Sequence, residues 1–194
     1  MKFDEQYWSG KYLQNQTGWD AGSITTPIKE YIDQLTDKDL RILVPGCGHG
    51  HEVHYLYSQG FKQVTVIDLS AEPYKTLRPK CPDWPDGRFI VGDFFDHQGE
   101  YDLIIEQTFF CALEPGLRQQ YADKMHALLA PGGKLVGVLF TIPLGDTQPP
   151  FGGSQEEYGR YFAGKFTFEV FAPCYNSIKP RAGNELFIKL RKQP

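Results

Sequence analysis

Short apolar runs alternate with helix-like segments along most of the chain. Seven segments have the apolar or alternating pattern of a strand: residues 40–45, 63–69, 88–92, 101–106, 134–141, 165–172 and 184–190. Helical patterns lie before and between the first five of these runs, at residues 26–35, 51–59, 70–80 and 115–129. This alternation is typical of a doubly wound α/β sheet. We therefore expect a Rossmann-like seven-stranded sheet, mostly parallel, with an antiparallel C-terminal hairpin.

Two segments stand apart from this alternation. Residues 1–23 are rich in Tyr, Trp, Gly and Asn and show no clean helical period. Residues 142–163 begin as a loop rich in Pro and Gly, and then carry a capping-box signature at 154–157 that predicts one more helix. The length of 194 residues suits one core. We expect residues 1–194 to form a single domain, with 1–23 as an arm and 142–163 as an insertion.

Aromatic side chains dominate the N-terminal arm, and two interpretations fit them. Trp8, Tyr12 and Trp19 are the most prominent. Large rings contribute much apolar surface, so they would anchor the arm on the core. Alternatively, the arm is a lid whose rings close over a ligand, which a positively charged ligand would favour. The composition alone leaves both interpretations open.

A glycine-rich loop at residues 46–50 follows the first apolar run and opens a helix. Glycines at alternate positions let the backbone turn tightly and let a ligand approach closely. A dinucleotide-binding loop would carry its third glycine where this chain has His51. Asp68 and Asp93 end the next two strands, where carboxylates can accept hydrogen bonds from ribose hydroxyls and from an adenine amine. These features favour S-adenosylmethionine, against helix-capping turns or an NAD-dependent oxidoreductase.

Composition and charge narrow the class of partner. A formal net charge of -4 and a pI near 5.7 argue against nucleic acid or an anionic membrane as partners. No apolar run approaches a membrane span of roughly 20 residues, and the first residues lack the apolar core of a signal peptide. The four cysteines show no C-x-x-C pair, so we expect free thiols. We expect a cytoplasmic monomer.

Four stretches of sequence together resemble the thiopurine S-methyltransferase family, nearest its halide and thiol methyltransferase branch. They are residues 8–22, 43–48, 93–95 and 108–115, and residues 149–151 and 177–185 match more loosely. The resemblance covers nearly the whole chain. It implies a class I methyltransferase that uses S-adenosylmethionine and a small-molecule methyl acceptor, with residues 1–23 as a lid and 142–163 on the acceptor side.

The resemblance also implies particular site residues. Cofactor contacts are expected at Trp8, Tyr12, Trp19, Gly46, Cys47, Gly48, Asp68, Leu69, Asp93, Phe94 and Gln107. Acceptor contacts are expected at Trp8, Trp19, Phe151 and Arg181. Arg181 would attract an anionic acceptor, although a plain surface arginine is an equal alternative.

Two positions depart from the family pattern. Gln107 stands where thiopurine-type members have an arginine and halide-type members a tyrosine, and Tyr12 replaces a tryptophan of the halide branch. Both positions lie where acceptor preference could be set. The branch of the family is therefore left open.

The sequence offers no constellation for a chemical base, a covalent nucleophile or a metal. The cluster of His49, His51 and His54 has the wrong spacing for an H-E-x-x-H site, so we expect solvated or packed histidines and no metal. Methyl transfer from a sulfonium to a soft anion needs alignment and removal of water rather than a base. We expect transfer to a small soft nucleophile, most simply a thiol. Transfer to halide or thiocyanate, or a non-catalytic cofactor-binding module, are the alternatives.

Overall fold

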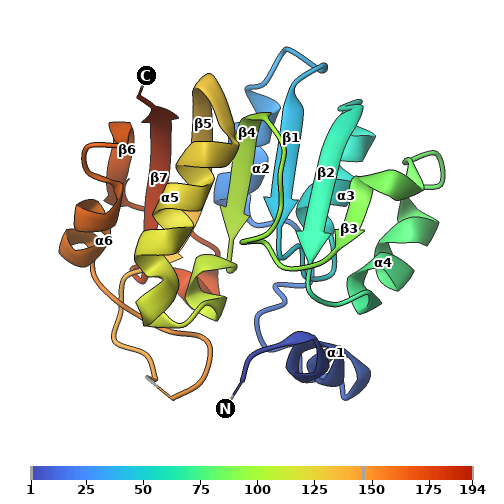
Figure 1. Ribbon diagram of the computed structural model, residues 1–194, viewed down its shortest axis with the longest axis horizontal. Helices are drawn as coiled ribbons and strands as arrows, with labels where there is room; N and C mark the ends of the chain where they lie inside the picture. The colour runs from blue at the N-terminus through green and yellow to red at the C-terminus, as the bar shows by residue number, and fades with distance from the viewer. Residues whose placement is uncertain (1, 146, 194) are drawn as a thin grey trace.

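The computed structural model describes residues 2–145 and 147–193, which fold around one seven-stranded sheet (Figure 1). The strands are β1 (Arg41–Pro45), β2 (Gln63–Asp68), β3 (Phe89–Val91), β4 (Tyr101–Gln107), β5 (Leu129–Phe140), β6 (Phe166–Pro173) and β7 (Glu185–Lys192). Their order across the sheet is β3-β2-β1-β4-β5-β7-β6. Strands β1 to β5 pair in parallel, whereas β7 is antiparallel to both β5 and β6. The predicted fold class is confirmed.

Helices cover both faces of the sheet. They are α1 (Glu5–Leu13), α2 (Thr26–Asp33), α3 (His51–Ser58), α4 (Glu72–Leu77), α5 (Arg118–Leu128) and α6 (Gln155–Phe162), with short 3-10 turns at Arg78–Lys80, Asp86–Arg88, Phe110–Ala112, Pro115–Leu117 and Lys179–Arg181. One buried cluster joins the sheet to α2, α3 and α4, and a second joins it to α5 and α6. The apolar faces of the helices therefore bury both sides of the sheet, as the doubly wound pattern requires.

Helix α1 is the element that the sequence pattern missed. Asp4 caps it by accepting a hydrogen bond from the Tyr7 backbone N–H at 3.3 Å, and none of its residues is buried. A helix without a buried stripe leaves no apolar period in the sequence. The aromatic arm is therefore a helix followed by an irregular segment, rather than irregular throughout.

The start of β5 also differs from expectation. The Pro-Gly-Gly sequence at residues 131–133 was expected to separate the preceding helix from a strand that begins at Lys134. Instead, β5 already begins at Leu129, which pairs with Tyr101 of β4. The register shifts between this pair and the next, Leu103 with Lys134, so the three residues are accommodated as an irregularity within the strand.

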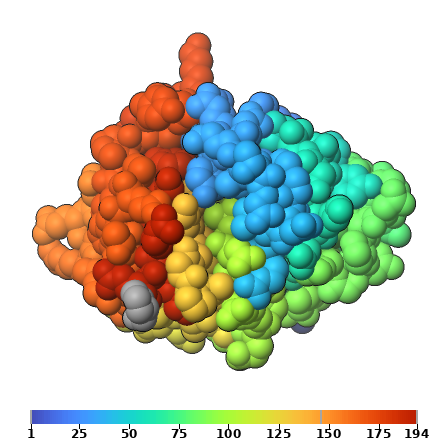
Figure 2. All heavy atoms as spheres, turned by 90° about the horizontal axis from the view of Figure 1, so that it is seen from above, coloured from blue at the N-terminus to red at the C-terminus, as the bar shows by residue number. Residues whose placement is uncertain are grey.

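The carboxyl ends of the parallel strands face the N-terminal arm. In Figure 1, α1 lies beyond the edge of the sheet where β1 and β2 end. Helix α1 contacts α4, and Ser9 of α1 also contacts Ser70, which lies just before α4, with their hydroxyl oxygens 2.7 Å apart. Figure 2, seen from above, shows α2 (blue) beside the C-terminal segment (orange to red). Asn176, in the segment after β6, donates a hydrogen bond to Glu30 of α2. No described helix is long and apolar enough to cross a membrane.

Candidate active site

The glycine loop has the tight, left-handed geometry that its sequence predicts. Gly46 and Gly50 have φ angles of 57° and 72°. A Cβ on Gly46 would lie 2.4 Å from the Phe109 ring, and one on Gly50 would lie 2.8 Å from Leu77. Glycine is therefore required both for the backbone angles and for the close packing of the loop. The loop connects β1 directly to the N-terminus of α3.

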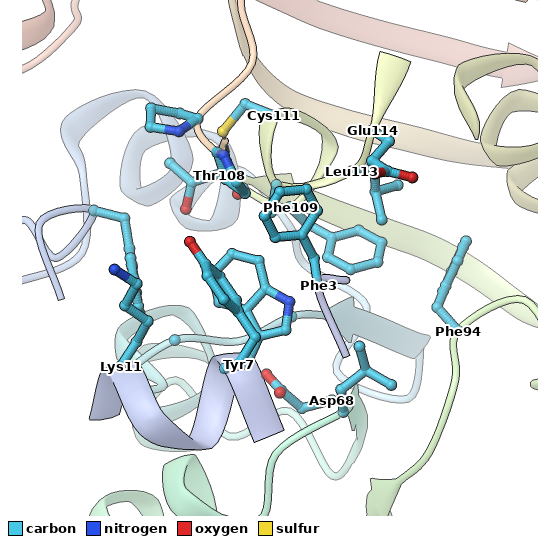
Figure 3. A pocket seen from close by; sticks show the side chains of 18 of the residues that line it. Phe3, Tyr7, Lys11, Asp68, Phe94, Thr108, Phe109, Cys111, Leu113 and Glu114 are labelled. Atoms are coloured by element: carbon cyan, nitrogen blue, oxygen red, sulfur yellow. Dashed lines mark hydrogen bonds between the residues drawn. The ribbon is translucent and has the colours of Figure 1, made fainter. Parts of the chain in front are cut away.

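Asp68, at the end of β2, is buried and points into the adjoining cavity (Figure 3). One of its oxygens accepts a hydrogen bond from the Ser70 backbone N–H at 2.9 Å. Burial raises the pKa of this carboxyl to about 6, even though hydrogen bonds from the backbone of Ser70 and Cys47 favour its charged form. The capping turn that was one alternative for this residue is present, and the side chain still lines the cavity.

Asp93 occupies the corresponding position beyond β3. Its carboxylate accepts a hydrogen bond from the Phe95 backbone N–H at 2.8 Å, and the residue lines the same cavity as Asp68. The ends of β1, β2 and β3 thus bring the glycine loop and two carboxyl groups to one hollow. Sequence spacing predicted this convergence.

A cavity of about 770 Å³ extends from these strand ends to the arm. The predicted site residues that line it are Trp8, Tyr12, Trp19, Gly46, Gly48, Asp68, Leu69, Asp93, Phe94 and Arg181. Cys47 and Gln107 instead line a small adjoining pocket of about 30 Å³. Phe151 is 2% exposed and lies behind the wall: its ring packs edge-on against Phe3, and its backbone N–H donates to the Cys111 carbonyl.

Several lining residues were not singled out from the sequence. Phe3, Tyr7 and Lys11 come from the arm, while Thr108 and Phe109 come from the segment after β4. Figure 3 shows Tyr7 and Phe109 facing the same space from opposite sides. Tyr7 and Lys11 belong to α1, so recognising Asp4 as a helix cap would have placed them on one face.

Aromatic contacts hold the arm together, and polar contacts fasten it to the rest of the molecule. The Trp19 ring packs edge-on against the rings of Trp8 and Tyr12, with centroids 5.7 and 5.5 Å apart. Its backbone carbonyl accepts a hydrogen bond from Arg181 at 2.7 Å. The Asp20 carboxylate lies 2.8 Å from the ring nitrogen Nε2 of His51, at the start of α3. The arm is therefore anchored on the core and also forms one wall of the cavity, and its closing over a ligand stays a prediction.

Two buried nitrogen atoms beside the glycine loop have no hydrogen-bond partner within the described chain: Gln107 Nε2 and Arg181 Nη1. The Thr25 hydroxyl donates to the carbonyl oxygen of the Gln107 side chain at 2.8 Å, which leaves the amide nitrogen unpaired. Arg181 Nη1 lies 3.6 Å from Glu185, beyond hydrogen-bond distance. Both residues line the small pocket, so this end of the site offers unpaired donors to an acceptor group on a ligand.

Few groups in the site can serve as a nucleophile, a base or a metal ligand. Cys111 lines the cavity, but burial raises the pKa of its thiol to about 12, so it stays protonated near neutral pH. His49 and His51 lie 3.7 and 2.8 Å from Asp20. Among residues 2–145 and 147–193, no group of three His, Cys, Asp or Glu side chains has the arrangement of a metal site.

Solved structures share this fold. A 1,6-didemethyltoxoflavin-N1-methyltransferase of Burkholderia thailandensis matches with a TM-score of 0.80 and 21% identity, over 98% of this chain and 87% of that one. An N-methyltransferase of Bradyrhizobium japonicum matches with a TM-score of 0.71 and 21% identity, over 98% of this chain and 100% of that one. Both were crystallised with S-adenosylhomocysteine, but at these identities the likeness is one of fold alone.

Comparison with protein families and with related sequences, added to the fold and the site, defines the chain as an S-adenosylmethionine-dependent methyltransferase. It belongs to the thiopurine S-methyltransferase family, whose model matches residues 3–186. Probable thiol methyltransferase 2 of Arabidopsis thaliana is 32% identical, over 95% of this chain and 84% of that protein. Thiocyanate methyltransferase 1 of Brassica oleracea is 31% identical, over 76% and 67%. A thiopurine S-methyltransferase of Pseudomonas fluorescens is 27% identical, over 86% and 85%.

Proposed function

We propose that this methyltransferase acts on a thiol, which it methylates by direct displacement at the cofactor sulfonium. The observation that carries the proposal is one cavity that joins the glycine loop and two strand-end carboxyl groups to a largely aromatic wall. Its volume of about 770 Å³ falls within the range of small-molecule sites, roughly 300–1,000 Å³. Relatives named as thiol and thiopurine S-methyltransferases support a sulfur acceptor.

The cofactor-binding half of the cavity follows from the strand ends. S-adenosylmethionine, when bound, supplies a methyl group on a positively charged sulfur. Asp68 would accept hydrogen bonds from the ribose hydroxyls and Asp93 from the adenine amine, while Phe94 would pack beside the base. The rings of Trp8 and Trp19 would face the positive sulfur, because ring faces attract cations. Gln107 would donate a hydrogen bond from its unpaired amide nitrogen to the carboxylate of the cofactor.

The acceptor half of the cavity is apolar. Phe3, Tyr7, Phe109, Leu113 and Leu117 line it. A thiol with an apolar substituent would bury that substituent here, at about 25 cal/mol per Å² of apolar surface removed from water. The same wall excludes water from the sulfur nucleophile, which strengthens its attack. The thiol would react as its thiolate, after its proton has passed to water, and the new carbon–sulfur bond would replace the methyl–sulfur bond broken at the sulfonium. Alignment and desolvation would then carry the reaction, without a dedicated base.

A second candidate is transfer to thiocyanate or halide. The unpaired Arg181 Nη1 beside the cavity would attract a small anion, and one relative is named as a thiocyanate methyltransferase. A thiol and a small anion differ in what they gain from the apolar wall. Each added methylene should strengthen binding of a thiol by about 0.8 kcal/mol, or roughly fourfold, whereas thiocyanate and halides gain nothing from it.

We also propose how the arm and the whole chain work. Residues 1–23 would act as a lid that closes over both ligands, and residues 142–163 would form part of the acceptor side through Gln148, Pro149 and Pro150. The four cysteines are free and buried, which suits the cytoplasm, and we expect a monomer. Light scattering during size-exclusion chromatography tests the oligomeric state.

An acceptor screen with labelled S-adenosylmethionine tests the activity. Alkyl thiols of increasing length, aryl thiols, thiopurines, bisulfide, thiocyanate and iodide should be compared at equal concentration. We expect kcat/KM to rise with the apolar size of the thiol. A flat response with a preference for thiocyanate or iodide would support the second candidate. Tight S-adenosylhomocysteine binding with no methylation of any acceptor would support a binding module instead.

A further inference from the structure

Glu106, near the end of β4, is a fully buried carboxyl group that accepts hydrogen bonds from the turn after β4 and from α5. Its Oε1 atom accepts hydrogen bonds from the backbone N–H groups of Phe109 at 2.8 Å and Phe110 at 2.9 Å. Its Oε2 atom accepts one from the Tyr121 hydroxyl at 2.6 Å. Gly137 of β5 leaves room for it, since a Cβ there would lie 2.1 Å from the Glu106 carbonyl oxygen. Burial raises the pKa of the carboxyl to about 7.

These hydrogen bonds hold a turn whose backbone conformation is unfavourable for the residue at its start. Thr108 has a φ of 59°, which is unusual for a β-branched residue. Such a conformation persists only where the surroundings over-determine it. The Glu106 carboxyl grips the two N–H groups that directly follow Thr108, so it is the group that fixes this turn.

The turn at residues 108–110 determines where the aromatic wall of the cavity lies. Phe109 packs against the Phe94 ring, with centroids 5.1 Å apart, and its ring lies where a Cβ on Gly46 would be. Thr108, Phe109 and Cys111 all line the cavity. A shift of the turn would therefore move this wall of the cavity, whereas Asp68 and Asp93 lie at the ends of other strands, outside the turn.

We propose that Glu106 is a positioning residue for the methyl acceptor, acting through its grip on the turn at residues 108–110. The assignment rests on the proposed function, because it takes that wall to be the acceptor side. Glu106 touches no ligand itself. Burying a carboxyl group costs free energy. Here the carboxyl group accepts hydrogen bonds from three donors that an apolar side chain would leave unpaired.

The Glu106→Gln and Glu106→Ala variants test the assignment. In Glu106→Gln the amide oxygen can accept from both N–H groups and the amide nitrogen can donate to Tyr121, so the acceptor KM should stay within about threefold of the original. In Glu106→Ala the acceptor KM should rise about tenfold or more, because several hydrogen bonds are lost. The kcat and the dissociation constant of S-adenosylhomocysteine should change less than about threefold. Equal KM values in the two variants would overturn the assignment.

A second pair of variants serves if the alanine variant does not fold. Tyr121→Phe deletes one bond to Glu106 and keeps the ring. Tyr158→Phe deletes a matched hydroxyl in the same aromatic cluster, one that bonds the Phe140 carbonyl instead. Tyr121→Phe should raise the acceptor KM about threefold, and Tyr158→Phe should leave it unchanged at a similar cost in thermal stability. The same KM change in both variants would reduce Glu106 to a structural role.

Amide hydrogen exchange separates this proposal from the proposed function. Protection of the Phe109 and Phe110 amides should fall selectively in Glu106→Ala, whether or not any acceptor is methylated. Unchanged protection would overturn the assignment. Failure of the original protein to methylate every thiol would overturn the proposed function and leave the grip of Glu106 to be judged by exchange alone.

Discussion

Replacing Asp68 by Asn should abolish a proton release that accompanies cofactor binding near pH 6. Burial raises the pKa of Asp68 to about 6 in the free protein. Ribose hydroxyls that donate to the carboxylate would favour its charged form, so binding lowers the pKa again. At pH 6 about half of the molecules carry the proton on Asp68, and about half a proton should leave per cofactor bound. At pH 7.5 the release should be negligible.

The same linkage fixes the magnitude of the pH effect on affinity. If binding lowers the pKa by about two units, the apparent affinity should fall about tenfold between pH 7.5 and pH 5. Asp68→Asn removes this dependence. At pH 7.5 it should also weaken binding by about 1.5–3 kcal/mol, the worth of a hydrogen bond to a charged group, which is roughly 10- to 150-fold.

Isothermal titration calorimetry with S-adenosylhomocysteine measures both effects. Titrations at pH 6 in two buffers of different ionisation enthalpy give the number of protons released. Asp96→Asn is the matched control, since Asp96 is exposed and lies outside the cavity lining. Equal proton release from the original protein and Asp68→Asn would refute the role of this carboxylate, as would equal affinity at pH 7.5.

Three further predictions concern stability and the thiol in the cavity. Because folding raises the pKa of Asp68 from 3.8 to about 6, its contribution to stability is fully present below pH 3.8 and is lost as pH rises through 6. Urea unfolding should therefore show the Asp68→Asn variant gaining about 2.4 kcal/mol relative to the original protein between pH 4 and pH 8. Gly46→Ala should lower the free energy of unfolding by about 2 kcal/mol or more, because its Cβ would clash with Phe109. Gly60 also has a positive φ but has open space for a Cβ, so Gly60→Ala should lower it by only about 1–2 kcal/mol. Equal losses would contradict the packing argument. Cys111→Ala should keep kcat within about threefold in the thiol assay, since its thiol stays protonated, and a hundredfold loss would show that it takes part in transfer.

The parts of the fold that repeat a pattern were predictable from the sequence, and the parts that rest on single contacts were not. The apolar runs that form β1 and β2 announce strands buried on both faces. Asp68 and Asp93 could be placed at one edge because parallel strands end together. Helix α1 buries no residue and therefore has no period to detect.

The far wall of the cavity was beyond prediction for a similar reason. Phe109 and Glu106 owe their roles to a turn with positive φ at Thr108, a residue type that does not suggest one. Phe151, expected at the acceptor site, lies behind the wall against Phe3. The loop around Phe151 has no regular pattern, so its sequence could not predict which of its side chains would face the cavity.

The anchors of the arm determine when the site forms during folding. The arm, residues 1–23, is fastened to partners that are made after it: Ser9 contacts Ser70, and the Trp19 carbonyl accepts a hydrogen bond from Arg181. Arg181 lies in the segment between β6 and β7. The arm therefore cannot complete its contacts until the segment that carries Arg181 has been made. A partly made protein should have most of its sheet before it has a complete binding site.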